Sequence, residues 1–281
     1  MSELISVIVT TYNWPEALAA SLNSLLVQQD RHFEIIVADD GSRAETHRLI
    51  SDFRRNSLIA IQHVHHEDKG FRAGTIRNKA VAASSGRYLL FIDGDCIALP
   101  NFIQRHRELA EQSYFVPGNR ILVSQAYTEQ VLQQNIALHF GSFLFFAKLW
   151  LQRHINRLLP LIYWNFKDWR YRQPEYWQKA MTCNLAIWKS DFIATNGFDE
   201  IYEGWGYEDS DLVIRLIHHG VKRKEGRFAA PVLHLWHRQN DRSQHDQNYQ
   251  RLLQRLNDKS LIRADRGVDQ YLNTAKIQER T

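Results

Sequence analysis

The chain has 281 residues, of which 44% are hydrophobic and 23% charged, so one large α/β domain or two small ones are possible and disorder throughout is excluded. Two cysteines exclude a disulfide framework or a four-thiolate zinc site and fit a reducing compartment. The net charge of +4 permits anionic partners without distinguishing among them. No signal peptide and no apolar run of roughly 18 residues is apparent, so we expect a cytoplasmic location.

The first hundred residues alternate between strand and helix patterns. Strands are predicted over 4–10, 33–38, 58–64 and 87–92, because short runs rich in β-branched residues are typical of buried strands. Helices are predicted over 13–27 and 73–84, with a polar helical segment between the second and third strands. This alternation predicts a mostly parallel, doubly wound α/β sheet, in which ligands bind beyond the carboxyl ends of the strands.

The rest of the chain changes character twice. Residues 127–179 read as a helical insertion rich in aromatic and basic side chains, and a strand over 181–188 and a helix over 210–219 follow. After residue 241 the chain is polar, with one amphipathic helix marked by three leucines, Leu252, Leu253 and Leu256. We therefore expect a main domain over 1–240 and a C-terminal helical tail over 241–281.

Two acidic turns follow predicted strands. Asp93 and Asp95 flank Gly94, and a turn there could converge both carboxylates on Mg²⁺ or Mn²⁺, although an ordinary Asp-Gly turn is the alternative. Asp39 and Asp40 could accept hydrogen bonds from a ribose or a base, or could simply begin the next helix.

Three further motifs carry candidate binding groups. Two arginines, one of them Arg77, lie at the glycine-rich start of a predicted helix, which favours phosphate, whereas a solvated surface is the alternative. Glu208 and Asp209 follow Gly204-Trp205-Gly206-Tyr207, which reads either as an aromatic sugar platform or as helix capping. His234 and His237 diverge if their segment stays a strand, so at most one would then bind metal.

Together these motifs resemble family 2 glycosyltransferases of the GT-A fold. The second half also resembles the galactosyltransferase-type C-terminal region of bacterial chondroitin polymerases and animal β-1,4-galactosyltransferases. The resemblance covers most of residues 4–240 and rests on the order and spacing of SVIVTTYNWPEAL, ADDGS, GFRAGTIRNKA, FIDGDC, NLAIWKSDFIATNGFDEIYEGWGYEDSDLVIRLIHHG and VLHLWH.

The resemblance implies a role for each matching residue. Asp209 matches the general base of the family, and Asp95 matches the more direct metal ligand of its DxD motif. The other implied roles are nucleotide binding by Thr10, Tyr12, Asp39, Asp40, Arg77 and Asp93, acceptor binding by Trp205, Tyr207 and Glu208, and metal binding by Asp93 and by His234 or His237. Tyr207 replaces a glycine often seen in that loop, which bears on acceptor identity.

The implied activity is inverting transfer of a hexose or N-acetylhexosamine from a UDP-sugar to a glycan or lipid-linked oligosaccharide. Mn²⁺ or Mg²⁺ is the expected cofactor, bacterial surface polysaccharide (lipopolysaccharide O-antigen or capsule) the expected product, and nucleic acid is not an expected partner. Competing hypotheses are a sugar nucleotidyltransferase, a dehydrogenase and a non-catalytic carbohydrate- or nucleotide-sugar-binding protein. The glycine-rich signatures that the first two classes carry after the first strand are not found in this sequence. A non-catalytic binding protein would give no function to Asp93, Asp95 and Asp209.

Two functions are possible for the aromatic and basic insertion over 127–179. A helical stripe is predicted from Phe140, Phe143, Leu144 and Ala147 through Leu151 and Ile155, with arginines and lysines interspersed. It either lies peripherally on the inner face of the cytoplasmic membrane or packs over the acceptor side of the site.

Overall fold

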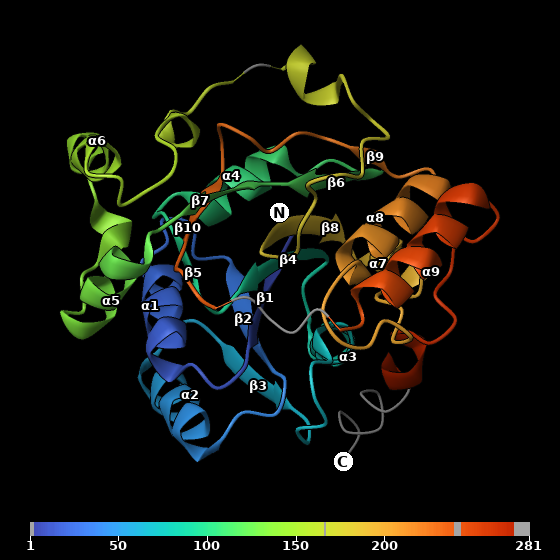
Figure 1. Cartoon of the computed structure of the whole chain (residues 1–281), viewed down its shortest axis with the longest axis horizontal. Helices are drawn as coiled ribbons and strands as arrows, with labels where there is room; N and C mark the ends of the chain where they lie inside the picture. Colours follow the sequence, from blue (N-terminus) through green and yellow to red (C-terminus); the bar gives the residue numbers. More distant parts are fainter. Residues whose placement is uncertain (1–2, 166, 239–242, 273–281) are drawn as a thin grey trace.

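The computed structural model describes residues 3–165, 167–238 and 243–272 (Figure 1). The N-terminal half alternates as predicted, and each of its strands ends close to the predicted residue. Its elements are β1 (Ile5–Thr11), α1 (Pro15–Leu26), β2 (Phe33–Asp39), α2 (Ala44–Asn56), β3 (Ile61–His65), α3 (Ala73–Ala83) and β4 (Tyr88–Asp93). Almost every side chain of β1, β2 and β4 is buried, which explains their continuous apolar runs.

The strands form a seven-stranded sheet in the order β3-β2-β1-β4-β8-β6-β9, with β8 (Asn184–Trp188), β6 (Tyr114–Pro117) and β9 (Lys222–Arg223) completing one side. β1 to β4 are mutually parallel, and β8 is antiparallel to both of its neighbours. In this register Thr10 lies beside both Ala38 and Asp93. The carboxyl ends of β1, β2 and β4 therefore meet, which confirms the expected α/β sheet and its mostly parallel character.

Helices cover both faces of this sheet (Figure 1). One apolar core joins the sheet to α1, α2 and α4 (Phe102–Leu109), with Leu18, Leu22 and Ile50 among its members. A second core joins the other face to α3, α7 (Lys189–Ala194) and α8 (Glu208–His218). α9 (His245–Asn257) packs against α8, and Leu252 of the predicted leucine set is its buried member.

A smaller sheet has the order β5-β10-β7, from β5 (Cys96–Ala98), β10 (Pro231–His234) and β7 (Asn119–Leu122). β10 pairs with β5 so that His234 lies opposite Cys96. A histidine from the C-terminal third is thereby placed beside Asp95, which precedes β5.

The insertion over 127–179 is less helical than predicted. Among its described residues, only α5 (Gln125–Gln133) and α6 (Phe143–Leu151) are α-helices. Short 3₁₀ turns lie between them at Leu138–Phe140 and after α6 at Leu159–Leu161 and Asp168–Tyr171. The predicted helical stripe continues only to Leu151, where α6 ends. Within α6, Phe146 and Leu149 are buried, whereas the stripe residues Phe143, Leu144 and Leu151 are exposed. Among the described residues, no helix combines the length and apolar character needed to cross a bilayer.

Candidate active site

A cavity of about 1010 Å³ opens at the carboxyl ends of β1, β2 and β4. Residues from every predicted motif line it together: Thr10, Tyr12, Asp40, Arg77, Asp93, Trp205, Glu208, Asp209, His234 and His237. The tryptophans Trp14 and Trp236 also line it, and sequence reasoning did not single them out. The sheet therefore brings six motifs, which extend along the sequence from Thr10 to His237, to one place.

Arg77 is a buried side chain that contacts four other residues lining this cavity. Its Nε donates a hydrogen bond to Thr10 Oγ1 at 2.9 Å, and its Nη2 lies 3.1 Å from Asp93 Oδ1. Its Nη1 lies 3.5 Å from Glu208 Oε1 and 3.7 Å from Asp209 Oδ1. Burial opposes its charge, but these three carboxylates raise the pKa of Arg77 above its ordinary value, so it stays cationic. Its position on α3, behind the strand ends, lets one side chain reach all three carboxylates.

Asp209 is oriented by Thr182, which lies just before β8. Thr182 Oγ1 donates to Asp209 Oδ1 at 2.9 Å, and the Thr182 backbone N–H donates to Oδ2 at 3.0 Å. The Asp209 side chain is nevertheless 18% exposed, so a carboxylate with a fixed orientation still faces the cavity. Thr182 is a positioning residue that sequence reasoning missed, because nothing in its surrounding sequence marks it.

Glu208 lies at the first turn of α8 and is more deeply buried than Asp209. Burial, reinforced by the neighbouring Asp209 carboxylate, raises the pKa of Glu208 to about 8, although Arg77 opposes that shift. The raised pKa favours the neutral carboxyl form of Glu208, which can donate a hydrogen bond at this end of α8.

Asp95, His234 and His237 form a set of potential metal ligands. Asp95 Oδ1 lies 3.6 Å from His234 Nε2, and Asp95 Oδ2 lies 3.6 Å from His237 Nε2. One ligand atom from each residue falls within 4.8 Å of the other two. The segment does not stay a strand as far as His237, because β10 ends at His234, so both histidines can face Asp95. Carboxylate oxygen is a ligand that Mn²⁺ takes and imidazole nitrogen is a ligand for divalent transition metals, so these residues can hold a divalent ion.

Gly94 allows the turn that separates the two aspartates. Its N–H donates to the Thr10 carbonyl at 2.7 Å, and a Cβ at this position would lie 3.0 Å from that carbonyl. Asp93 consequently faces Arg77, whereas Asp95 faces the histidines. The two carboxylates of the DxD motif thus have separate immediate partners.

Asp40 and Asp39 point to different surroundings. Asp40 lines the cavity, and its Oδ2 accepts a hydrogen bond from the Arg72 backbone N–H at 2.9 Å. Asp39 is not part of that lining, and its Oδ2 lies 2.9 Å from His63 Nε2 instead. Of the two predicted nucleotide contacts in this turn, the structure places Asp40 at the cavity.

Trp205 and Tyr207 also differ. Trp205 lines the cavity from a loop in which Gly204, Gly206 and Tyr207 all have positive φ values. Tyr207 is absent from the lining, and its hydroxyl lies 2.9 Å from His245 Nε2 on α9. The structure thus places the Trp205 ring, and not the Tyr207 ring, at the predicted sugar platform.

Comparison with known proteins supports the family resemblance that the sequence motifs indicated. A family model described as Glycosyl transferase family 2 matches residues 6–185, and one described as the N-terminal domain of galactosyltransferase matches residues 162–238. Validoxylamine A glucosyltransferase of Streptomyces hygroscopicus subsp. jinggangensis is 28% identical over 233 residues, which are 78% of this chain and 52% of that protein. Chondroitin synthase of Escherichia coli is 24% identical over 243 residues, 80% of this chain and 34% of that protein. The chain therefore spans about half the length of these relatives, or less.

Solved structures match over nearly the whole chain. TarS 1–349 of S. aureus in complex with UDP-GlcNAc has a TM-score of 0.61 at 15% identity, covering 97% of this chain and 71% of that one. The mannosyltransferase PcManGT from Pyrobaculum calidifontis, in complex with GDP-Man and Mn²⁺, has a TM-score of 0.57 at 16% identity, covering 99% and 74%. These likenesses confirm the predicted GT-A fold.

Proposed function

Because this chain belongs to glycosyl transferase family 2, we propose that it moves a hexose or N-acetylhexosamine from a UDP-sugar to a hydroxyl group of a glycan. The observation that carries this proposal is the cavity itself, where the oriented carboxylate of Asp209 lies together with Arg77, Asp93 and the histidines beside Asp95. The UDP-GlcNAc bound by TarS, a structure of the same fold, supports a UDP-sugar as donor.

The nucleotide binds, in this proposal, along the ends of β1, β2 and β4. Thr10, Tyr12 and Asp40 line this part of the cavity. Arg77 holds Asp93 in place and keeps positive charge under the diphosphate. Asp95 with His234 and His237 would hold Mn²⁺ or Mg²⁺, and Asp93 is a further candidate ligand. When bound, that ion supplies Lewis-acid stabilisation of the charge that develops on the departing diphosphate.

Asp209 is the proposed general base. It accepts the proton of the acceptor hydroxyl as that oxygen attacks the anomeric carbon, while the bond to the UDP oxygen breaks. A single displacement of this kind inverts the anomeric centre, so an α-linked donor gives a β-glycoside. Thr182 fixes both carboxylate oxygens of Asp209, and Glu208 and Trp205 bind the acceptor sugar beside it.

The acceptor is proposed to carry negative charge, as a lipid-linked oligosaccharide diphosphate does. A second cavity of about 530 Å³ adjoins the first, because Arg120, Met181 and Cys183 line both. Its lining contains five basic side chains and one acidic one: Arg120, Arg157, Lys179, Arg223, Arg227 and Glu225. Such a lining favours phosphate over a neutral glycan. Assembly of a bacterial surface polysaccharide is the role this acceptor would serve.

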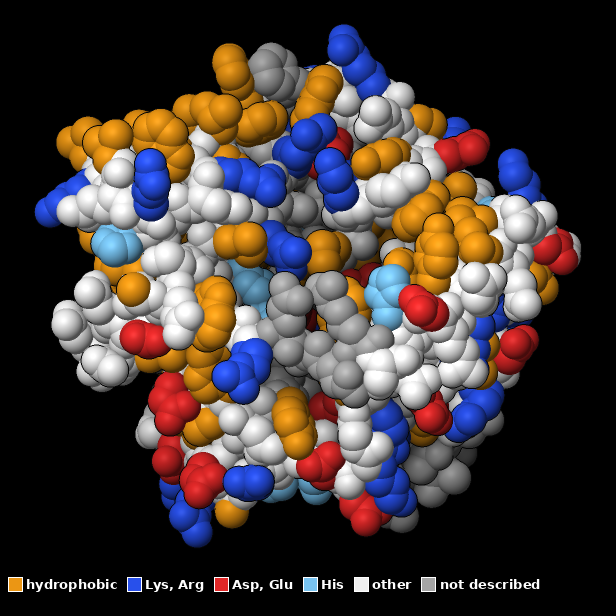
Figure 2. All heavy atoms as spheres, viewed as in Figure 1, with side chains coloured by type: hydrophobic (Ala, Val, Ile, Leu, Met, Phe, Trp, Pro, Cys, Tyr) orange, Lys and Arg blue, Asp and Glu red, His pale blue; other side chains and the backbone are white. Residues whose placement is uncertain are grey.

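We also propose that α6 and the segment after it contact the inner face of the cytoplasmic membrane. Large apolar side chains are exposed there, including Leu144 at 79% and Leu151 at 74%. Figure 2 shows apolar side chains gathered over α6, with lysine and arginine side chains nearby. No aspartate or glutamate occurs from residue 130 to residue 167, whereas Lys148, Arg153 and Arg157 do. An apolar face with basic neighbours is suited to anionic lipid.

Asp209→Asn tests the proposed reaction. We expect kcat for sugar transfer to fall by about 10²–10⁴, since the amide cannot take the proton of the acceptor hydroxyl. The affinity for UDP should change little, because the amide oxygen can still accept the hydrogen bond from Thr182. Transfer is measured with a radiolabelled UDP-sugar, UDP affinity by calorimetry, and Asp258→Asn, at an exposed position after α9, is the control. Unchanged transfer in Asp209→Asn would remove this residue from the mechanism.

A further inference from the structure

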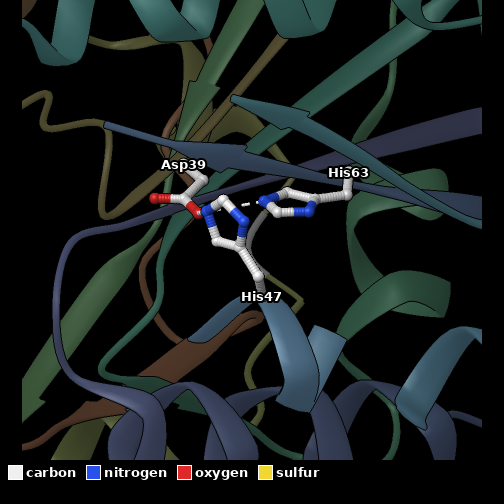
Figure 3. Close-up of side chains that lie close together, drawn as sticks. All are labelled: Asp39, His47 and His63. Atoms are coloured by element: carbon white, nitrogen blue, oxygen red, sulfur yellow. Dashed lines mark hydrogen bonds and ion pairs between the residues drawn. The ribbon is translucent and has the colours of Figure 1, made fainter. Parts of the chain in front are cut away.

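A second group of potential metal ligands lies at the outer edge of the sheet, outside the active-site cavity. Asp39 ends β2, His63 lies on the neighbouring edge strand β3, and His47 on α2 points toward both of them (Figure 3). One ligand atom from each residue falls within 4.8 Å of the other two. None of the three residues lines the active-site cavity. The reaction described above therefore does not use this group.

The distances within the group suit a small divalent ion. Asp39 Oδ2 lies 2.9 Å from His63 Nε2 and 3.4 Å from His47 Nε2. Two ligands in a tetrahedral zinc site with bonds of about 2.0–2.1 Å are roughly 3.3 Å apart. Both separations from Asp39 are close to that value, and one nitrogen of each imidazole lies within 4.8 Å of the other, so an ion could bind all three groups after side-chain movements.

One atom in this group has no other evident task. Nε2 of His47 is buried and, although Asp39 Oδ2 lies 3.4 Å away, makes no hydrogen bond with any residue that the structure describes. A buried polar atom without a hydrogen bond lowers the stability of the folded state, so it calls for an explanation. Coordination of a metal ion together with the neighbouring carboxylate would provide one. The Asp39 side chain is fully buried, and its Oδ1 accepts a hydrogen bond from the Ser42 backbone N–H, so Oδ2 is the oxygen that faces the two histidines.

A third histidine completes the surroundings. The ring of His65 lies 5.1 Å from that of His47 and 5.4 Å from that of His63. The fourth coordination position is thus open to water or to this imidazole.

We propose that Asp39, His47 and His63 bind one Zn²⁺ ion. Two imidazole nitrogens and one carboxylate oxygen with an accessible fourth position are ligands that this ion commonly takes. The ion would join β2, β3 and α2 directly behind the turn that presents Asp40 to the nucleotide. It is separate from the ion proposed at Asp95, and its role is to stiffen this turn.

The experiment counts zinc in variants of the whole chain. Protein stripped with EDTA is dialysed against buffered Zn²⁺, and zinc per chain is measured by plasma mass spectrometry. The test variants are His47→Gln alone and His47→Gln with His63→Gln. The control is His219→Gln, which removes an exposed histidine after α8. A variant with Asp95→Asn and His237→Gln removes the other candidate ion.

We expect both His47 variants to bind one zinc per chain less than the wild type and the control, whereas the Asp95 variant keeps the ion at Asp39. Loaded with Co²⁺, the Asp95 variant should show visible absorption of low-coordinate cobalt, and adding His47→Gln should abolish it. Circular dichroism establishes that each variant is folded, and the single His47→Gln change on the partly exposed face of α2 guards against misfolding of the double variant. Equal zinc content in wild type and folded His47→Gln would overturn the proposal.

Discussion

Arg77 is a buried cation that contacts three acidic side chains of the candidate site. It contacts Asp93, Glu208 and Asp209, and three acidic groups around one guanidinium leave negative charge in excess. Such an excess attracts a divalent cation. Burial first, and the neighbouring Asp209 second, raise the pKa of Glu208, and its neutral form can donate a hydrogen bond to an acceptor oxygen.

Glu208→Gln tests this protonation. The pKa of Glu208 is raised from 4.5 to about 8 on folding, so between these pH values the folded state holds a proton that the unfolded state has lost. The free energy of unfolding of the wild type must then fall as the pH rises from about 5 to about 8, by about 1.4 kcal/mol for each pKa unit. Glutamine does not titrate, so the variant should lack this component.

The measurement is urea unfolding at pH 5 and pH 8 in EDTA without nucleotide. Glu175→Gln, which replaces an exposed glutamate, is the control and should follow the wild type. Parallel pH dependence of wild type and Glu208→Gln would show that Glu208 ionises normally in the folded state.

At the scale of elements, sequence pattern identified the buried strands well. β1, β2 and β4 are continuous apolar runs because helices cover both of their faces. The start of β3 was predicted three residues early, since Leu58 belongs to the apolar run but is 95% exposed. The two-to-four-residue strands β5, β6, β7 and β9 had no sequence signal, because pairing with distant strands, and not local pattern, produces them.

In helix α6 the apolar sequence pattern does not predict which face of the helix is buried. Its sequence contains apolar residues on most sides, so the pattern alone did not decide which of them pack. The structure buries Phe146 and Leu149 and exposes Leu144 and Leu151. That exposed face is the basis of the proposed membrane contact.

Liposome flotation tests this contact. Vesicles containing phosphatidylglycerol should carry the wild type to the top of the gradient, and Leu144→Glu with Leu151→Glu should reduce the floated fraction at least about tenfold, because two charges replace apolar groups that would enter the lipid. Leu58→Glu is the matched control, since this leucine is exposed outside the insertion. If wild-type protein fails to float with anionic or neutral vesicles, the membrane proposal is abandoned.

For the molecule as a whole, the candidate site was predictable because it depends on topology. Turns that follow parallel strands must meet at one edge of the sheet, so Thr10, Asp40 and Asp93 could be grouped from sequence alone. The histidine pair could not, because its position depends on β10 pairing with β5 and on where β10 ends. Motif spacing also does not specify side-chain direction. Only the structure shows that Asp39 contacts His63 and that Tyr207 contacts His245.

The central claim is that this cavity transfers sugar from a UDP-sugar with the help of a divalent ion held by Asp95 and the two histidines. The most direct measurement is UDP release from a panel of UDP-sugars with Mn²⁺ or EDTA, for the wild type and for Asp95→Asn. We predict that the wild type turns over one donor with Mn²⁺, and that EDTA or Asp95→Asn abolishes this turnover. Failure of the wild type to bind or turn over any nucleotide sugar would contradict the account.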